Sequence, residues 1–140
     1  MTDFYLSKGV SHQTTCVETP QKNGIFERKH QHIMNVARAL MFQANLPKSL
    51  WSYAVIHSVH LINRFPTPLL QNKCPYIVLY KQQADLNHLK VFGCLAYSNT
   101  LKHGRTKLSP RARKTVFIGY KDGTKGYFFD TNEPIIFPNP

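Results

Sequence analysis

The strongest constraint on the fold is a helical repeat that ends at a proline. From Phe26 onward, mainly apolar residues recur at alternating steps of four and three, the spacing of one face of an α-helix; they are Phe26, His30, Ile33, Ala37, Leu40 and Ala44. Polar residues look away from that face, namely Glu27, Arg28, Gln31, His32, Asn35 and Arg38. Asn45-Leu46-Pro47 ends the helix, because proline cannot continue it and disfavours helical geometry in the preceding residue.

A second amphipathic helix follows directly. Ser49 is its predicted N-cap, and Pro66 and Pro68 end it. The same period places one face at Trp51, Ala54, Val55, Ser58, Leu61 and Ile62. Residues 75–80 are expected to add one or two helical turns, and residues 10–17 have the composition of a short strand. Two amphipathic helices in succession need a common partner surface.

The pattern changes to short β-rich runs beyond residue 90. These runs are residues 91–98, 115–120, 126–130 and 135–137, and Asp122-Gly123 is typical of a hairpin turn. The change places a boundary near residues 86–90. We therefore expect an α/β segment over residues 1–85 and a small all-β barrel over residues 86–140.

Basic residues exceed acidic ones and gather in two places. The 18 lysines and arginines against 7 acidic residues give a net charge of +11, which favours a polyanionic partner over a merely solvated surface, the alternative interpretation. One cluster is Lys22, Arg28, Lys29 and Arg38; the other is Lys102, Arg105, Lys107, Arg111, Arg113, Lys114, Lys121 and Lys125.

The cysteines and the hydropathy pattern exclude several classes of protein. Cys16, Cys74 and Cys94 are widely spaced and form no CxxC pair, so neither a disulfide framework nor a zinc ribbon is indicated. Apolar runs are too short for a membrane span, and the start of the chain lacks the pattern of a signal peptide. We expect reduced thiols, an intracellular location and no membrane partner.

A set of short motifs follows in order along nearly the whole chain. The motifs are Gly9-Val10-Ser11-His12-Gln13, Thr19-Pro20-Gln21-Lys22-Asn23-Gly24-Ile25-Phe26-Glu27-Arg28-Lys29, Ala37-Arg38-Ala39-Leu40, Leu46-Pro47, Leu50-Trp51, Leu61-Ile62-Asn63-Arg64, Leu89-Lys90-Val91-Phe92-Gly93-Cys94, Pro110-Arg111-Ala112 and Phe117-Ile118-Gly119-Tyr120. Taken together, they resemble the integrase region of copia-class LTR retrotransposon Pol polyproteins.

This resemblance implies a DDE-type polynucleotidyl transferase with an RNase H-like core and an SH3-like domain. The expected fold is the last strand and two to three helices of a truncated RNase H-like core, followed by a small SH3-like barrel. In the family, two aspartates and a glutamate hold two divalent ions, usually Mg²⁺, that serve DNA strand transfer. Glu27 matches the third carboxylate and is thus the expected catalytic and metal-binding residue. The alternative role of Glu27 is to compensate the helix dipole at the N-terminus.

The resemblance also implies that this chain alone is catalytically incomplete. Both family aspartates are expected upstream, farther from Glu27 than Met1 allows, and Asp3 lies too close to it. One carboxylate cannot hold two metals, so we expect Mg²⁺ in the parent enzyme and no stable binding here. His12 and Cys16 are interpreted as strand residues, because the zinc-binding region of the family is not matched.

DNA is the expected partner, and no small-molecule substrate is expected. Phosphate contact is predicted for Lys22, Arg28, Lys29, His32, Arg38, Arg105, Lys107, Arg111, Arg113 and Lys114. Tyr120, Tyr127 and Phe128 can stack on bases, whereas Phe117, Phe128 and Phe129 also fit an aromatic core. Exposed apolar helix faces predict self-association. If functional, the protein must reach the nucleus. The alternatives to an integrase fragment are a non-enzymatic nucleic-acid-binding module and an inert transposon remnant.

Overall fold

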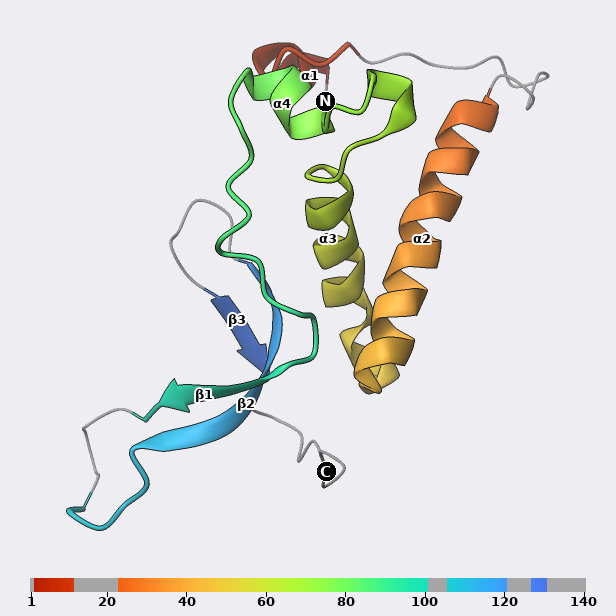
Figure 1. Cartoon of the computed structure of the whole chain (residues 1–140). Helices are drawn as coiled ribbons and strands as arrows, with labels where there is room; N and C mark the ends of the chain where they lie inside the picture. Colours follow the sequence, from red (N-terminus) through yellow and green to blue (C-terminus); the bar gives the residue numbers. More distant parts are fainter. Residues whose placement is uncertain (1, 12–22, 101–105, 121–126, 131–140) are drawn as a thin grey trace. The chain divides into compact units, whose positions relative to one another are not determined.

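The computed structural model describes residues 2–11, 23–100, 106–120 and 127–130. Helices come first along the chain and strands last, in the order shown in Figure 1. The chain divides into two compact units, residues 1–32 and 33–140, which are described separately below.

The first unit contains a short helix and the beginning of a long one. Helix α1 covers Thr2–Ser7 and ends in a turn where the Lys8 and Val10 amides donate to the Tyr5 carbonyl, at 3.1 and 2.9 Å. The strand expected over residues 10–17 falls mostly outside the described residues, and Val10 and Ser11 belong to no strand.

Helix α2 covers Gly24–Ala44, which confirms the predicted helix and its end. Ala37 is buried and Ile33, Leu40 and Ala44 are half-buried, as the predicted apolar face requires, whereas Phe26 and His30, also predicted on that face, are exposed. The predicted polar face is exposed throughout. Asn45 follows with φ of 49°, a left-handed conformation that asparagine tolerates and that ends the helix.

Helix α3 covers Trp51–Ile62 and follows the 3₁₀ turn η2, Lys48–Leu50. The predicted N-cap role of Ser49 is wrong: Ser49 lies inside the 3₁₀ turn that starts after Pro47, and the N-cap of α3 is Leu50, without a side-chain hydrogen bond. Ala54 and Ser58 are fully buried as the period predicts, whereas Trp51 is 59% exposed.

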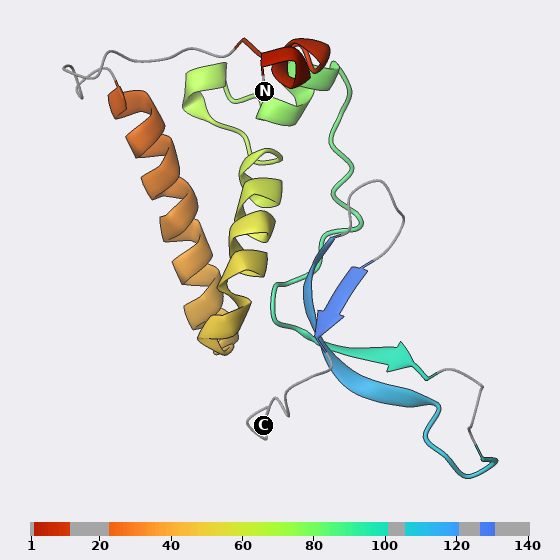
Figure 2. The same ribbon diagram turned by 180° about the vertical axis from the view of Figure 1, so that it is seen from behind.

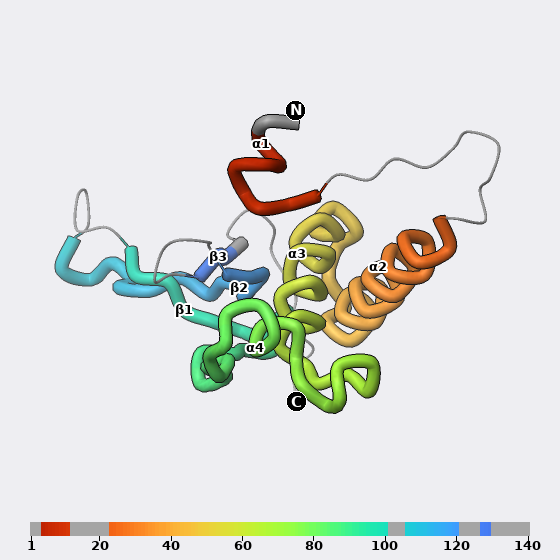
Figure 3. Tube along the Cα trace, turned by 90° about the horizontal axis from the view of Figure 1, so that it is seen from above, coloured from red at the N-terminus to blue at the C-terminus, as the bar shows by residue number. Residues whose placement is uncertain are grey.

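The segment after α3 turns back through the 3₁₀ turn η3, Pro68–Leu70, and the helix α4, Pro75–Tyr80. The predicted turns at residues 75–80 are confirmed, and Pro75 occupies the first helical turn, where its missing N–H costs nothing. The Tyr76 amide donates to the Asn63 carbonyl at 2.9 Å and ties α4 to the end of α3. In the trace of Figure 3 the chain can be followed from α3 through α4 to the strands.

The strands form one antiparallel sheet in the order β1-β2-β3 (Figure 2). Strand β1 covers Leu95–Asn99, β2 covers Ala112–Tyr120 and β3 covers Tyr127–Asp130. An irregularity between Phe117 and Gly119 shifts the β2–β3 register. The expected turn at Asp122-Gly123 and the run at residues 135–137 lie outside the described residues.

The expected closed barrel is not what the described strands form. In the part of the chain that the structure describes, β2 pairs with both neighbours while β1 and β3 stay unpaired with each other, so the sheet is open. The first strand also starts at Leu95 and not at residue 91, because Phe92 and Gly93 form a turn in which Gly93 has φ of +80°.

The core of the second unit joins helices to the sheet. Buried Ala54 of α3 and Val116 and Ile118 of β2 belong to one apolar cluster, together with Ala37, Leu46, Leu50 and Phe92. The cluster thus includes residues from both sides of the expected boundary near residues 86–90. The division of the chain into domains at residues 1–85 and 86–140 stays a prediction. Cys74 and Cys94 are free thiols. Among the described helices, none is long and apolar enough to cross a membrane.

Candidate nucleic-acid interface

The first turns of α2 present Glu27 and the basic residues that follow it to solvent. Arg28, Lys29 and His32 are all exposed, and Arg28 and His32 lie four residues apart on one side of the helix. The Arg28 Nε donates to the Gly24 carbonyl at 3.1 Å, which leaves the two terminal nitrogens of its guanidinium available to a phosphate. This surface can therefore bind an anion beside Glu27.

Glu27 is an exposed carboxylate in the first turn of α2. Within the described residues, no group of three His, Cys, Asp or Glu side chains could hold a metal ion. Glu27 can thus supply one ligand of a metal centre, and the same position suits a carboxylate that stabilises the helix N-terminus.

Arg38 lies farther along α2, in the second unit. Its Nη1 donates to the Asn35 Oδ1 at 3.3 Å, and both side chains are exposed. The bond orients the guanidinium along the polar face of the helix. Arg38 keeps four further N–H donors for a phosphate.

The basic residues of the sheet segment gather around the start of β2. Lys107 and Arg111 are exposed before β2 begins, and Arg113 and Lys114 are its exposed second and third residues. Arg113 is in register with Ser98, and Lys114 with Tyr97. Successive residues of a strand point to opposite faces, so the side chains of Arg113 and Lys114 leave the sheet on opposite sides. Lys22 and Arg105, also expected to contact DNA, lie outside the described residues.

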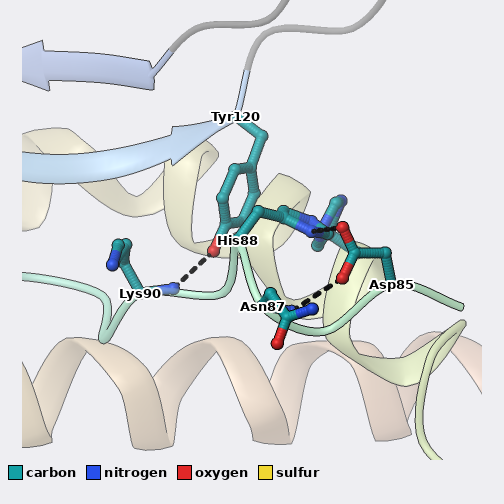
Figure 4. Close-up of polar contacts among 6 residues, drawn as sticks. Asp85, Asn87, His88, Lys90 and Tyr120 are labelled. Atoms are coloured by element: carbon teal, nitrogen blue, oxygen red, sulfur yellow. Dashed lines mark hydrogen bonds and ion pairs between the residues drawn. The ribbon is translucent and has the colours of Figure 1, made fainter.

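A cluster of histidine rings around Tyr120 is the feature that the sequence patterns missed. Tyr120 stacks on His60, with ring centroids 4.3 Å apart, and on His57 at 5.4 Å. Its hydroxyl accepts a 2.8 Å hydrogen bond from the Lys90 amide (Figure 4). Tyr120 therefore packs inside the protein and is not free to stack on a nucleic-acid base. Burial raises the pKa of its hydroxyl.

His88 joins this cluster through its two ring nitrogens. Its Nε2 lies 3.3 Å from the His60 Nε2, and its Nδ1 lies 4.0 Å from a carboxylate oxygen of Asp85. The other Asp85 oxygen accepts a hydrogen bond from the Asn87 amide at 2.9 Å (Figure 4). The Asp85–His88 distance is too long for a hydrogen bond, whereas one of the two Nε2 atoms of His60 and His88 donates to the other.

The aromatic residues of the strands divide between core and surface. Phe117 is 1% exposed, as the core interpretation expects, whereas Tyr127, Phe128 and Phe129 are 43%, 41% and 36% exposed. Tyr97 on β1 is 61% exposed and lies opposite Lys114. An aromatic ring beside a cation is a surface suited to a nucleic-acid strand.

Comparisons with known proteins connect these features to a class of domain. Residues 94–132, which contain the sheet, match the family model of the retroviral polymerase SH3-like domain. The helical part of the chain lies outside that match. No solved structure matches the chain.

Similarity to larger proteins extends over most of the chain. It is 42% identical over 118 residues to the retrovirus-related Pol polyprotein from transposon RE2 of Arabidopsis thaliana, 40% identical over 118 residues to that from transposon RE1 of the same plant, and 39% identical over 125 residues to that from transposon TNT 1-94 of Nicotiana tabacum. These alignments cover 84–89% of this chain and 8–9% of the relatives. The chain is thus related to one segment of retrotransposon Pol polyproteins, which confirms the predicted resemblance.

Proposed function

We propose that this chain is the part of a copia-class integrase that joins the end of the catalytic core to an SH3-like domain, and that it contacts DNA. The similarity to Pol polyproteins and the net charge of +11 support this function. The main observation in support of DNA contact is that the predicted cations on α2 and around the start of β2 are exposed. Exposed cations can neutralise phosphates without first breaking ion pairs.

Glu27 is the proposed third carboxylate of the integrase metal site. Its exposure and its place in the first turn of a helix fit a ligand with a fixed backbone. The described residues offer no complete metal site around it, so Glu27 would act with carboxylates supplied elsewhere in the longer protein. When bound there, Mg²⁺ would activate the attacking hydroxyl and stabilise the leaving oxygen.

The helices α2, α3 and α4 are proposed to belong to the end of an RNase H-like core. Large apolar side chains on all three helices are exposed, among them Phe42 at 83%, Trp51 at 59% and Leu79 at 71%. An apolar surface of this kind needs a cover. The rest of the polyprotein or a second copy of the chain would supply it, and integration would require access to the nucleus.

The test uses Glu27→Gln in a longer Pol segment that carries the remaining carboxylates. Strand transfer with Mg²⁺ should be abolished while DNA binding persists, because the change removes one ligand and keeps size and polarity. Gln43→Ala, at an exposed position of the same helix that is not predicted to contact DNA, is the matched control and should retain strand transfer. If the Glu27→Gln protein joins DNA normally, the segment is a nucleic-acid-binding module without a catalytic residue.

A further inference from the structure

A cavity of about 500 Å³ lies in the second unit, between α3, α4 and the end of β2. Its walls include His57, His60, Arg64, Tyr76, Tyr80 and Tyr120. The volume falls in the range of about 300 to 1,000 Å³ that is typical of small-ligand sites. This is a volume suited to a single small ligand such as one nucleotide.

Two side chains of this cavity carry buried polar atoms that lack a partner. Among the described residues, three buried side-chain atoms make no hydrogen bond, and two of them are the His57 Nδ1 and the Arg64 Nε. Buried polar atoms are nearly always satisfied in folded proteins, so each exception calls for an explanation. A ligand that offers an acceptor to Arg64 and a polar edge to His57 would satisfy both.

The remaining walls suit a flat ring next to an anion. The rings of Tyr76 and Tyr80 lie 4.7 Å apart at an angle of 45°, and the Arg64 guanidinium carbon lies 5.2 Å from the centre of the Tyr76 ring. The Arg64 Nη1 donates to the His60 carbonyl at 3.1 Å, which fixes the guanidinium at the cavity wall. Aromatic rings that stack a base, beside a cation that binds its phosphate, are the usual means of holding a single-stranded nucleotide.

We propose that this cavity binds one unpaired DNA nucleotide, with its base against Tyr76 and Tyr80 and its phosphate at Arg64. The inference rests on the proposed DNA contact and adds a site for single-stranded DNA. Buried His57 is neutral near pH 7, because burial lowers its pKa to about 4. Its Nδ1 can then donate to or accept from the edge of the base.

Three DNA probes of equal length test the proposal with the 140-residue chain. They are a blunt duplex, a duplex with a two-nucleotide overhang, and the same duplex with abasic residues in the overhang. Fluorescence anisotropy should show that the overhang with bases binds about tenfold more tightly than the abasic one, the effect of one base stack. The abasic overhang keeps its phosphates, so the abasic probe should bind at least as tightly as the blunt one.

Variants locate the effect in the cavity. Tyr76→Leu and Tyr80→Ala should remove the tenfold preference and leave the affinity for the blunt duplex unchanged. Tyr80 is 58% exposed, so Tyr80→Ala decides the matter if Tyr76→Leu does not fold. Phe42→Leu changes an exposed aromatic residue of α2 that does not line the cavity, so it is the control and should keep the preference.

Each contrary result has a separate meaning. Equal binding of the base-containing and abasic overhangs would overturn the nucleotide site while leaving the proposed DNA contact intact. A preference that persists in the folded cavity variants would also overturn it, because the base would then bind elsewhere. Failure to bind any of the three probes at low salt would overturn the proposed function together with the site.

Discussion

His57 is a titratable side chain inside the core, where it is 2% exposed and contacts the rings of Phe92 and Phe117. Burial lowers its pKa from 6.5 to about 4. Below pH 6.5 the unfolded chain therefore takes up a proton that the folded chain accepts only near pH 4. The free energy of unfolding should fall over this window as the pH drops, by up to roughly 3 kcal/mol, and His57 should have no effect above it.

Urea unfolding at a series of pH values measures this dependence. The variant His57→Phe keeps a flat ring and should flatten the profile between pH 4 and 6.5. His32→Gln, at an exposed position of α2, should leave the profile as it is. A His57→Phe profile as steep as that of the native chain would show that His57 does not titrate in this way.

Glu27 lies beside the basic residues of α2, so its charge opposes phosphate binding. In the 140-residue chain, Glu27→Gln should leave DNA affinity unchanged or raise it slightly, because it removes a negative charge beside Arg28. Helix stability should fall by no more than about 1 kcal/mol, the contribution of a carboxylate at a helix N-terminus. Anisotropy with duplex DNA and thermal unfolding measure the two effects; a clear loss of affinity would contradict this expectation.

Single residues were predictable where local periodicity decides their exposure. The exposure of Glu27 and Arg38 follows from the helical repeat of α2, and burial of Ala37 follows from the same repeat. The contacts of His57 and His60 with Tyr120 join residues about 60 positions apart in the sequence. Local patterns carry no information about such pairs, because the packing of α3 on β2 brings them together.

The turn before β1 depends on a close approach between the backbone at Gly93 and the end of α2. Gly93 has φ of +80°, and a Cβ placed on it would collide with the Cβ of Ala44 at the end of α2. Its amide also donates to the Phe117 carbonyl at 2.9 Å. Gly93→Ala should destabilise the chain by about 2 kcal/mol or more, through backbone strain and overpacking.

A matched substitution controls for the loss of a glycine as such. Gly24 begins α2 without a positive φ and with open space where a Cβ would lie, so Gly24→Ala should leave stability unchanged or raise it slightly. Thermal unfolding of both variants measures the difference. Equal stability of the Gly93→Ala and native chains would mean that α2 and the turn before β1 do not approach so closely.

The start of β2 carries two exposed cations next to each other in the sequence. Because Arg113 and Lys114 leave the sheet on opposite sides, a duplex on one face should contact only one of them. One of the substitutions Arg113→Ala and Lys114→Ala should reduce the log–log salt slope of DNA binding by about 0.9, and the other should leave it unchanged. Equal reductions by both would place this end of the strand differently against DNA.

Elements were predicted well where proline and periodicity mark them, as at the end of α2 and throughout α4. The start of α3 was not, because Ser49 matches the composition of an N-cap while the backbone already turns at Lys48. The short β-rich runs also indicated strands without specifying closure. Whether a sheet closes depends on pairing between distant strands, and in the described residues β1 and β3 do not meet.

At the scale of the whole molecule, charge and ancestry together support DNA binding. The relatives are Pol polyproteins of which this chain matches 8–9% of the length. The chain has 18 basic and 7 acidic residues, and the basic excess is concentrated in two stretches of sequence. Relatives of this kind make DNA the polyanion to test first. Binding through phosphates should be independent of sequence and sensitive to salt.

The salt dependence of DNA binding shows directly whether phosphate contacts hold this chain on DNA. Affinity for a random-sequence duplex should be measured by anisotropy from about 50 to 200 mM salt, over which phosphate-driven binding weakens strongly. We predict a log–log slope at least as steep as about −2, which corresponds to two or more phosphate contacts at about −0.9 each. A slope near zero, or no binding at the lowest salt, would contradict the claim that this chain contacts DNA through its exposed cations.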